Sequence, residues 1–249
     1  MVCREGETMR IFAIGDLHLP GGDDKPMDVF GGHWEDHFQR ISQDWRERVA
    51  DEDVVLIPGD ISWAMQLDNA RPDLQAIGEL PGSKLIMKGN HDYWWNTLTQ
   101  VRSALPASIR AIQHNAVDVG CAVVCGTRGW TIPTKETPLS PEDEKIYNRE
   151  LIRLELALKE GEKLRGDKPL VVMMHYPPLY DLERDTAFTG LLEKYPVHTV
   201  VYGHLHGAGL RVAFRGEHHG IRYELVSCDG LGFSLAELDL TSCGEKSTK

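Results

Sequence analysis

The feature of this sequence that most limits its fold is a repeated pairing of a short apolar run with a polar cluster. Each apolar run is typical of a buried strand, and each cluster begins where that strand would end. Five clusters follow one another: Asp16-Leu17-His18, Gly59-Asp60, Gly89-Asn90-His91-Asp92, His175-Tyr176-Pro177-Pro178 and Gly203-His204-Leu205-His206. Because neighbouring strand ends converge at one edge of a sheet, we expect the clusters to form one site.

Strand and helix patterns alternate three times in the first hundred residues. The predicted strands cover 10–14, 53–57 and 84–87, and the predicted helices cover 34–49, 68–80 and 95–105. This alternation indicates βαβ units and therefore a parallel sheet. Loops at the carboxyl ends of such strands are where ligands usually bind.

The rest of the chain is richer in strands. Predicted strands cover 109–112, 116–119, 122–125, 170–174 and 197–202, and one long helix covers 140–164. Ser140 and Pro141 suit the N-cap and first turn of that helix. The last strand-like segments, 210–214, 221–226 and 233–238, predict an antiparallel meander.

The length of 249 residues suits one large α/β domain, and no linker or repeat divides the chain. We therefore predict a single domain over 1–249, with flexible ends at 1–8 and 244–249. The five cysteines are scattered and form no C-x-x-C pair, which favours reduced thiols in a cytoplasmic protein.

The net charge of −11 argues against long nucleic acid as a partner. The N-terminus has no apolar signal segment, and no apolar run approaches the roughly 18 residues of a membrane span. We therefore expect no membrane partner, while the sequence leaves the oligomeric state open.

The polar clusters contain ligand types that divalent first-row metals accept. Asp16 and His18 are two residues apart, which in an extended chain points both side chains to one side. His204 and His206 share that spacing, and the two oxygens of Asp60 could bridge two ions. Seven donors result, enough for two ions: Asp16, His18, Asp60, Asn90, His175, His204 and His206.

Each cluster alone has an ordinary structural explanation. Gly59-Asp60 is typical of a turn, and His175 could be a hydrogen-bonded core histidine. Five such clusters, each after an apolar strand, are hard to explain as unrelated turns.

On these five motifs, over roughly residues 10 to 206, the chain resembles the calcineurin-like metallophosphoesterases. The resemblance implies a four-layer α/β/β/α sandwich of two mixed β-sheets flanked by helices. It implies that two divalent ions bind, with Mn, Fe, Zn or Ni as candidates and Mn favoured. It also implies a division of ligands: Asp16, His18 and His206 on one ion, Asn90, His175 and His204 on the other, and Asp60 bridging them.

The resemblance further implies a phosphohydrolase acting on a small phosphomonoester or phosphodiester. A metal-bound hydroxide would attack phosphorus, and His91 would stabilise the phosphoryl group or protonate the leaving oxygen. We take His91 as the general acid. The alternatives are a non-catalytic scaffold of the same fold and a hydrolase of non-phosphate esters.

One departure from the family pattern narrows the function. Phosphoprotein phosphatases of this superfamily carry Gly-Asp-x-x-Asp-Arg, whereas here Trp63 and Ala64 follow Asp60 at those last two positions. This argues against a typical Ser/Thr phosphoprotein phosphatase. It also leaves the partner of His91 open, although Asp92 is adjacent in sequence.

Weaker signals lie outside the clusters. Trp63 could line the cleft, although core packing is favoured for it. Arg128 and Lys135, in the long segment 126–140, could bind phosphate oxygens. The pair His218-His219 is interpreted as a turn.

Overall fold

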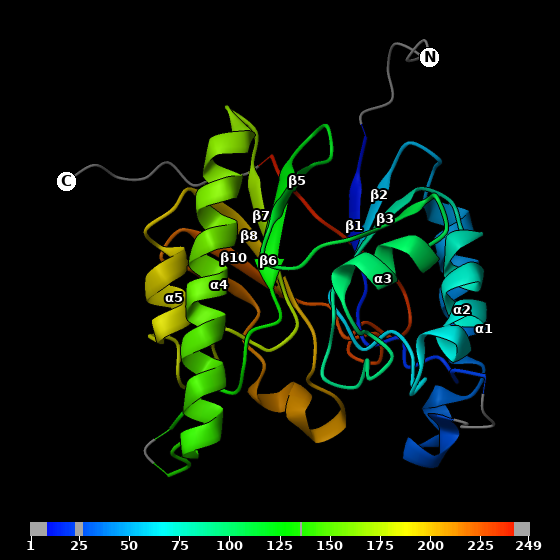
Figure 1. Cartoon of the computed structure of the whole chain (residues 1–249), viewed down its shortest axis with the longest axis horizontal. Coiled ribbons are helices and arrows are strands. Elements are labelled where there is room, and N and C mark those ends of the chain that lie inside the picture. Colours follow the sequence, from blue (N-terminus) through cyan, green and yellow to red (C-terminus); the bar gives the residue numbers. More distant parts are fainter. Residues whose placement is uncertain (1–8, 23–26, 135, 242–249) are drawn as a thin grey trace.

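The computed structural model describes residues 9–22, 27–134 and 136–241 of the chain. The ends predicted to be flexible, 1–8 and 244–249, lie outside these described residues. Figure 1 shows two sheets side by side, with helices on their outer faces.

The first sheet has the strand order β11-β1-β2-β3-β4. Its strands are β1 (Ile11–Ala13), β2 (Val54–Ile57), β3 (Ser83–Ile86), β4 (Ile109–Ala111) and β11 (Ala236–Glu237). β1 to β4 pair in parallel, as the alternation of strands and helices predicts, and only β11 is antiparallel to its neighbour.

The second sheet has the order β5-β6-β7-β8-β10-β9. Its strands are β5 (Ala116–Asp118), β6 (Val123–Thr127), β7 (Leu170–Met174), β8 (Val197–Tyr202), β9 (Gly216–His218) and β10 (Ile221–Leu225). The central strands β6, β7, β8 and β10 are parallel, and the two edge strands are antiparallel.

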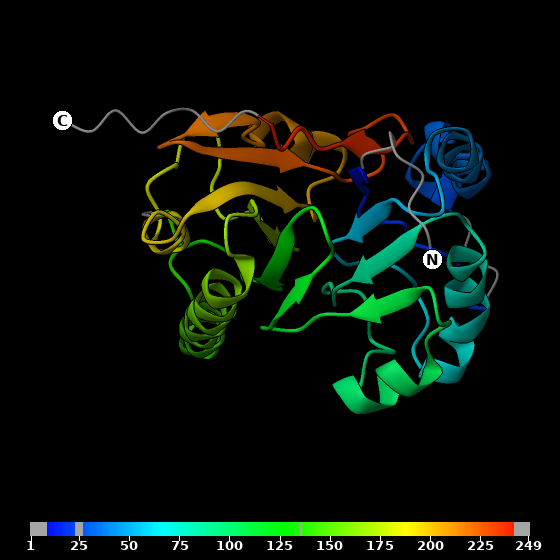
Figure 2. The ribbon, with the colours of Figure 1, turned by 90° about the horizontal axis from the view of Figure 1, so that it is seen from above.

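Helices cover the outer face of each sheet. Those on the first sheet are α1 (His37–Arg48), α2 (Leu67–Gly78) and α3 (Leu98–Ala104), and those on the second are α4 (Pro141–Arg165) and α5 (Ala187–Leu192). The view from above shows the resulting layers of helix, sheet, sheet and helix (Figure 2). The predicted four-layer sandwich of two mixed sheets is therefore confirmed.

Both faces of each sheet are buried, which explains why the strands are apolar runs without polar alternation. In β1, Ile11 and Ala13 face the second sheet, while Phe12 packs under the helices of the first. The layer between the sheets also contains Val54, Leu85, Val171 and Val201.

Two predictions for the last third of the chain are wrong. Segment 210–214 is not a strand, because residues 207–212 form the 3-10 helix η3 (Gly207–Val212), in which no side chain is buried. The meander is also absent from the described chain. β10 lies parallel to β8, and β11 pairs with β1 in the other sheet. The short helix α5 was not predicted.

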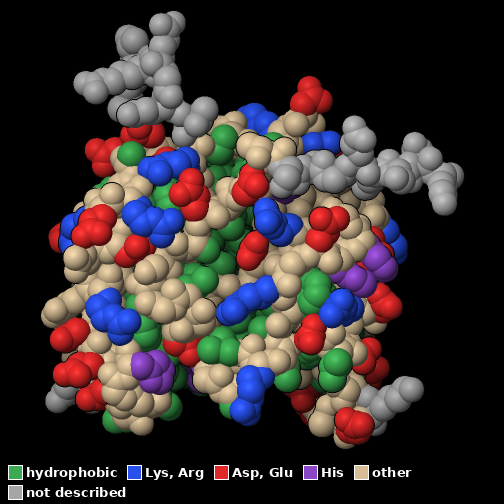
Figure 3. Space-filling model, turned by 180° about the vertical axis from the view of Figure 1, so that it is seen from behind, with side chains coloured by type: hydrophobic (Ala, Val, Ile, Leu, Met, Phe, Trp, Pro, Cys, Tyr) green, Lys and Arg blue, Asp and Glu red, His purple; other side chains and the backbone are tan. Residues whose placement is uncertain are grey.

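Within the described ranges, no helix is long and apolar enough to cross a membrane. On the face opposite to that of Figure 1, acidic and basic side chains are interspersed around a strip of apolar surface (Figure 3).

Candidate metal centre

The five polar clusters meet at the carboxyl ends of the central strands. Backbone hydrogen bonds hold them together: the Asp16 N–H donates to Gly59 O at 3.0 Å, and the Gly203 N–H donates to His175 O at 3.1 Å. Between the sheets, the His204 N–H donates to the Asp16 carboxylate at 3.0 Å, so the loops after β1, β2 and β3 face those after β7 and β8.

One group of donors contains Asp16, His18 and His206. One ligand atom of each lies within 4.8 Å of the others. His206 Nε2 is 3.5 Å from Asp16 Oδ1 and 3.4 Å from His18 Nε2. These are the three residues that the family resemblance implies for one ion.

A second group contains Asp60, His175 and His204, again with ligand atoms within 4.8 Å. Asn90 lies among them, with its Oδ1 2.6 Å from His175 Nε2 and 2.8 Å from His204 Nδ1. This is the set that the resemblance implies for the other ion, together with Asp60.

Asp60 lies between the two groups. Its Oδ2 is 3.8 Å from His18 Nε2 in the first, and its Oδ1 is 3.6 Å from His175 Nε2 in the second. The structure therefore brings all seven predicted donors together, and their role as ligands stays a prediction.

The backbone of the site is not extended, so the expected extended geometry of both two-residue pairs is wrong. Asp16 and His18 nevertheless fall in one donor group. Asp16, His18, Asp60 and His204 have φ values of 58°, 46°, 51° and 73°, in the left-handed region. His204 and His206 do not point to one side, because the left-handed turn at His204 sends them to different groups. Non-glycine residues in this region cost on the order of 1–2 kcal/mol each, and Asp and His tolerate it better than most.

The atoms of the second group suit a cation. His175 Nδ1 lies 2.9 Å from the carbonyl oxygen of Pro58, so Nδ1 carries a proton that it donates there. Burial lowers the pKa of His175, which keeps the ring neutral, and Nε2 then directs a lone pair at Asn90 Oδ1. Two acceptors that face each other without a proton between them fit a bound metal ion.

The electrostatics of the site also fit added positive charge. Burial, and then the charge of Asp16, raise the pKa of Asp60 to about 8. Burial acts the same way on Asp16, but the nearby His206, whose own pKa is raised to about 10, acts in the opposite direction, and the pKa of Asp16 stays below its ordinary value. Two buried carboxylates this close need positive charge between them.

Asp229 is a functional candidate that the sequence analysis missed. Its Oδ1 accepts a hydrogen bond from His206 Nδ1 at 2.8 Å, which turns Nε2 of that ring toward Asp16. Partners of this kind orient metal-binding histidines. The sequence signal for Asp229 is weak, because β10 (Ile221–Leu225) alternates apolar and charged residues and ends four residues before Asp229.

Asp92 does not orient the His91 side chain. Its Oδ1 accepts hydrogen bonds from the backbone of Ile61 and Ser62 and from Trp94 Nε1, and its Oδ2 accepts one from Gly89 N. Asp92 thus ties the loop after β2 to the loop after β3.

Packing holds His91 in place. Its backbone N–H donates to Asp60 Oδ1 at 2.8 Å, and its ring centroid lies 4.5 Å from that of Trp63. Trp63 also stacks on His18, with ring centroids 4.7 Å apart. The buried Nδ1 of His91 has no hydrogen-bond partner in the described structure. Trp63, in the position where phosphoprotein phosphatases carry Asp, therefore contacts both a predicted ligand and the predicted acid.

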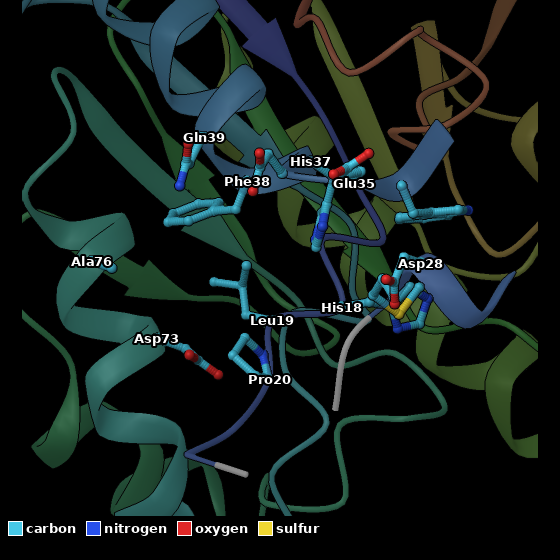
Figure 4. A pocket seen from close by; sticks show the side chains of 13 residues that line it. His18, Leu19, Pro20, Asp28, Glu35, His37, Phe38, Gln39, Asp73 and Ala76 are labelled. Carbon is cyan, nitrogen blue, oxygen red and sulfur yellow. The ribbon is translucent and has the colours of Figure 1, made fainter. Parts of the chain in front are cut away.

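Two pockets open beside the centre. One, of about 570 Å³, extends from His18 and Leu19 toward α2, with Glu35, His37 and Asp73 among its walls (Figure 4). The other, of about 320 Å³, has a mostly aromatic and apolar wall over three site histidines. Its lining includes Met27, Phe30, Trp34, Trp63, His18, His91 and His206.

Comparison with known proteins decides the family. The family model for calcineurin-like phosphoesterases matches residues 9–208, which contain all five clusters. The chain belongs to the calcineurin-like phosphoesterase family. Members of this family bind two metal ions, and the donor set described above fits two such ions.

Individual relatives are more distant. The Gene 66 protein of Mycobacterium phage D29 is 36% identical over 85 residues, which are 33% of this chain and 40% of that protein. The match thus spans well under half of that relative's length.

Two solved structures cover most of the chain at low identity. Phosphopantetheinyl hydrolase (PptH) from Mycobacterium tuberculosis aligns with a TM-score of 0.55 and 15% identity, over 92% of this chain and 95% of that one. The protein of unknown function AQ665 from Aquifex aeolicus aligns with a TM-score of 0.47 and 14% identity, over 92% and 96%. The likeness to PptH supports the calcineurin-like fold.

The weaker sequence signals lie elsewhere than at the centre, except for Trp63. His218 ends β9 and His219 lies in the turn before β10, paired with Asp185 and Glu193 respectively. Arg128 lies behind the second donor group, where its carbonyl oxygen accepts the N–H of His175. Lys135 is outside the described residues.

We expect Gly203→Ala to weaken metal binding. An added Cβ would lie 2.4 Å from Asp16 Oδ2, so the carboxylate would have to move away from its partners. Displacement of a supported ligand typically costs about 10–100-fold in metal affinity. Isothermal titration with Mn²⁺ measures the change. Gly190→Ala in α5, where an added Cβ meets nothing within 4 Å, is the control. Equal Mn²⁺ affinity in the two variants would contradict the expectation.

We expect Asp92→Asn to destabilise the fold. The new amide nitrogen would face the Gly89 N–H, or the Ile61 and Ser62 N–H groups, and leave a buried donor unpaired. Such a loss costs roughly 1–3 kcal/mol of unfolding free energy. Denaturant unfolding measures it, with the exposed Asp68→Asn as control. A denaturation midpoint equal to that of Asp68→Asn would show that the hydrogen bonds accepted by Asp92 do not contribute to the stability of the fold.

Proposed function

We propose that this protein is a metal-dependent phosphohydrolase that cleaves the phosphoester bond of a small substrate. The observation that carries the proposal is the convergence of seven oxygen and nitrogen donors in two groups that share Asp60. A non-catalytic scaffold would need no aromatic pocket over that convergence, and here one opens onto His18, His91 and His206.

The proposal assigns the donors to two ions. Asp16, His18 and His206 would hold one ion, with Asp229 fixing the orientation of His206. Asn90, His175 and His204 would hold the other, and Asp60 would serve both. When bound, the ions supply Lewis acidity toward the phosphoryl oxygens and the attacking water.

His91 is the proposed source of the proton for the leaving oxygen. Its Nδ1 is buried without a partner, so Nε2 is the atom that we assign to this transfer. The His91 ring lines the aromatic pocket and packs against Trp63. The backbone N–H of His91 donates to the Asp60 carboxylate, which fixes the position of the residue. Burial lowers the pKa of His91, so the competing role is that of a neutral hydrogen-bond donor to the phosphoryl group.

The organic part of the substrate is proposed to occupy the aromatic pocket. Aromatic rings form most of its wall, and its one carboxylate, Asp229, already accepts hydrogen bonds from His206 Nδ1 and the Gly207 N–H. Phe30 lines this pocket although it is 63% exposed, so its ring offers apolar surface to a substrate.

His91→Ala should keep both metals and lose about 10²–10⁴-fold in kcat. The substrates are 4-nitrophenyl phosphate, its bis ester and phenyl phosphate, measured with and without added Mn²⁺, with metal content determined on the same protein. A general acid predicts a larger loss with phenyl phosphate, because phenolate is the poorer leaving group. An equal loss of kcat on 4-nitrophenyl phosphate and phenyl phosphate would assign His91 to phosphoryl binding. Unchanged turnover would show that His91 has no part in catalysis. Full metal occupancy without any turnover in the wild type would favour the scaffold.

Phe30→Ala should raise the KM for 4-nitrophenyl phosphate roughly three- to tenfold and leave kcat nearly unchanged, because contact with the aryl ring is lost in both ground and transition states. Val29→Ala is the matched control. Val29 is adjacent, 73% exposed and not part of the pocket wall. A KM that responds equally to both variants would place the aryl group elsewhere.

A further inference from the structure

A third, smaller pocket lies behind the second donor group and gathers positive charge. It has a volume of about 200 Å³, and its wall includes Lys88, Arg128, Arg149, Arg153, Gln113 and Glu150. Four basic side chains thus meet one acidic side chain, in a chain whose net charge is −11. Like charges repel, so such a cluster is costly unless a ligand compensates it.

The one carboxylate of the pocket is already occupied. Glu150 is fully buried, with Oε1 2.7 Å from Arg153 Nη1 and Oε2 2.5 Å from Thr127 Oγ1. It therefore neutralises one guanidinium at most, and three positive charges remain without a counter-charge on the pocket wall.

The remaining donors are largely unused. The Arg128 guanidinium lies 4.6 Å from the centre of the Trp130 ring, and Lys88 Nζ donates one hydrogen bond, to Trp95 O. Among the described residues, neither Arg128 nor Arg149 has a hydrogen bond from its guanidinium. An arginine has five N–H donors and a lysine three, so the pocket holds far more donors than acceptors.

The charges are close enough to act on one another. Burial lowers the pKa of Arg128, Glu150 raises it, and Arg153 and Arg149 lower it. The Trp130 ring lies against the guanidinium of Arg128, a group that binds oxyanions in a bidentate manner.

We propose that this pocket is an anion site that takes a phosphate-type oxyanion, separate from the metal centre. Its volume is below the roughly 300 Å³ at which pockets for drug-sized ligands begin, so it suits a small tetrahedral anion. Lys88 lies two residues before Asn90, and the Arg128 carbonyl accepts the His175 N–H, so the anion sits directly behind the predicted metal ligands. The proposal does not depend on catalysis.

Thermal unfolding of the metal-loaded protein in sulfate tests the site, with chloride at matched ionic strength as reference. The wild type should show a saturable rise in Tm. Arg128→Gln should weaken the apparent sulfate affinity at least about tenfold. Arg110→Gln is the charge-matched control, because Arg110 is exposed on β4 and absent from the pocket wall. An equal response of these two variants, or a rise that does not saturate, would overturn the site.

A second readout separates binding from a structural role. Without sulfate, the double variant Arg128→Gln, Arg149→Gln should unfold at or above the wild-type temperature, because it relieves repulsion. A clear decrease would mean that the arginines stabilise the fold, and it would overturn the proposal.

The source of the anion is tested with bisphosphonates of increasing chain length against methylphosphonate. If the substrate carries a second phosphate, one of the bisphosphonates will bind more tightly to the wild type than methylphosphonate does. Arg128→Gln will then remove that gain in affinity. If the anion is a separate phosphate, no bisphosphonate gains affinity while sulfate still binds. Both results support the site. If the wild type does not hydrolyse 4-nitrophenyl phosphate, that result contradicts the proposed hydrolase activity and leaves the anion site standing.

Discussion

The contact between the two sheets at their carboxyl ends is the constraint on which the site depends. The Asp16 carboxylate, after β1, accepts the His204 N–H at 3.0 Å with both oxygens, and His204 follows β8 of the other sheet. The Gly15 N–H donates to Val226 O across the same seam, and the Cys228 N–H donates to Gly15 O. Both donor groups take residues from both sheets, so neither sheet alone could form either group.

The sequence predicts the fold and the site well wherever burial dictates the pattern. Central parallel strands are buried on two faces, so their apolar runs end abruptly, and those ends locate Asp16, Asp60 and His175. The prediction failed where an apolar sequence pattern does not correspond to buried side chains. Segment 210–214 is apolar enough for a strand, yet its first three residues lie in η3, in which no side chain is buried. Asp229 was missed because its partner, His206, is remote in sequence and only the fold joins them.

The left-handed backbone at four site residues explains how so many donors fit in one place. An extended loop would alternate its side chains between two faces, whereas φ values of 46–73° turn the chain back at Asp16, His18, Asp60 and His204. The strain, roughly 1–2 kcal/mol for each residue, persists only because surrounding hydrogen bonds over-determine the loops. Asp92, with four accepted bonds, is the main anchor of this kind between the second and third loops.

The two sides of the loop after β3 have opposite chemistry. The Asn90 side-chain oxygen lies among the acceptor atoms of the second donor group. The Lys88 ammonium, two residues earlier, lies in the pocket that also contains three arginines. On the other sheet, the His175 ring enters the centre, and the backbone N–H of His175 donates to the carbonyl oxygen of Arg128. The same short segments therefore shape a region that attracts cations and a region that attracts anions. A net charge of −11 predicts neither region, because local geometry sets the sign of the field in each.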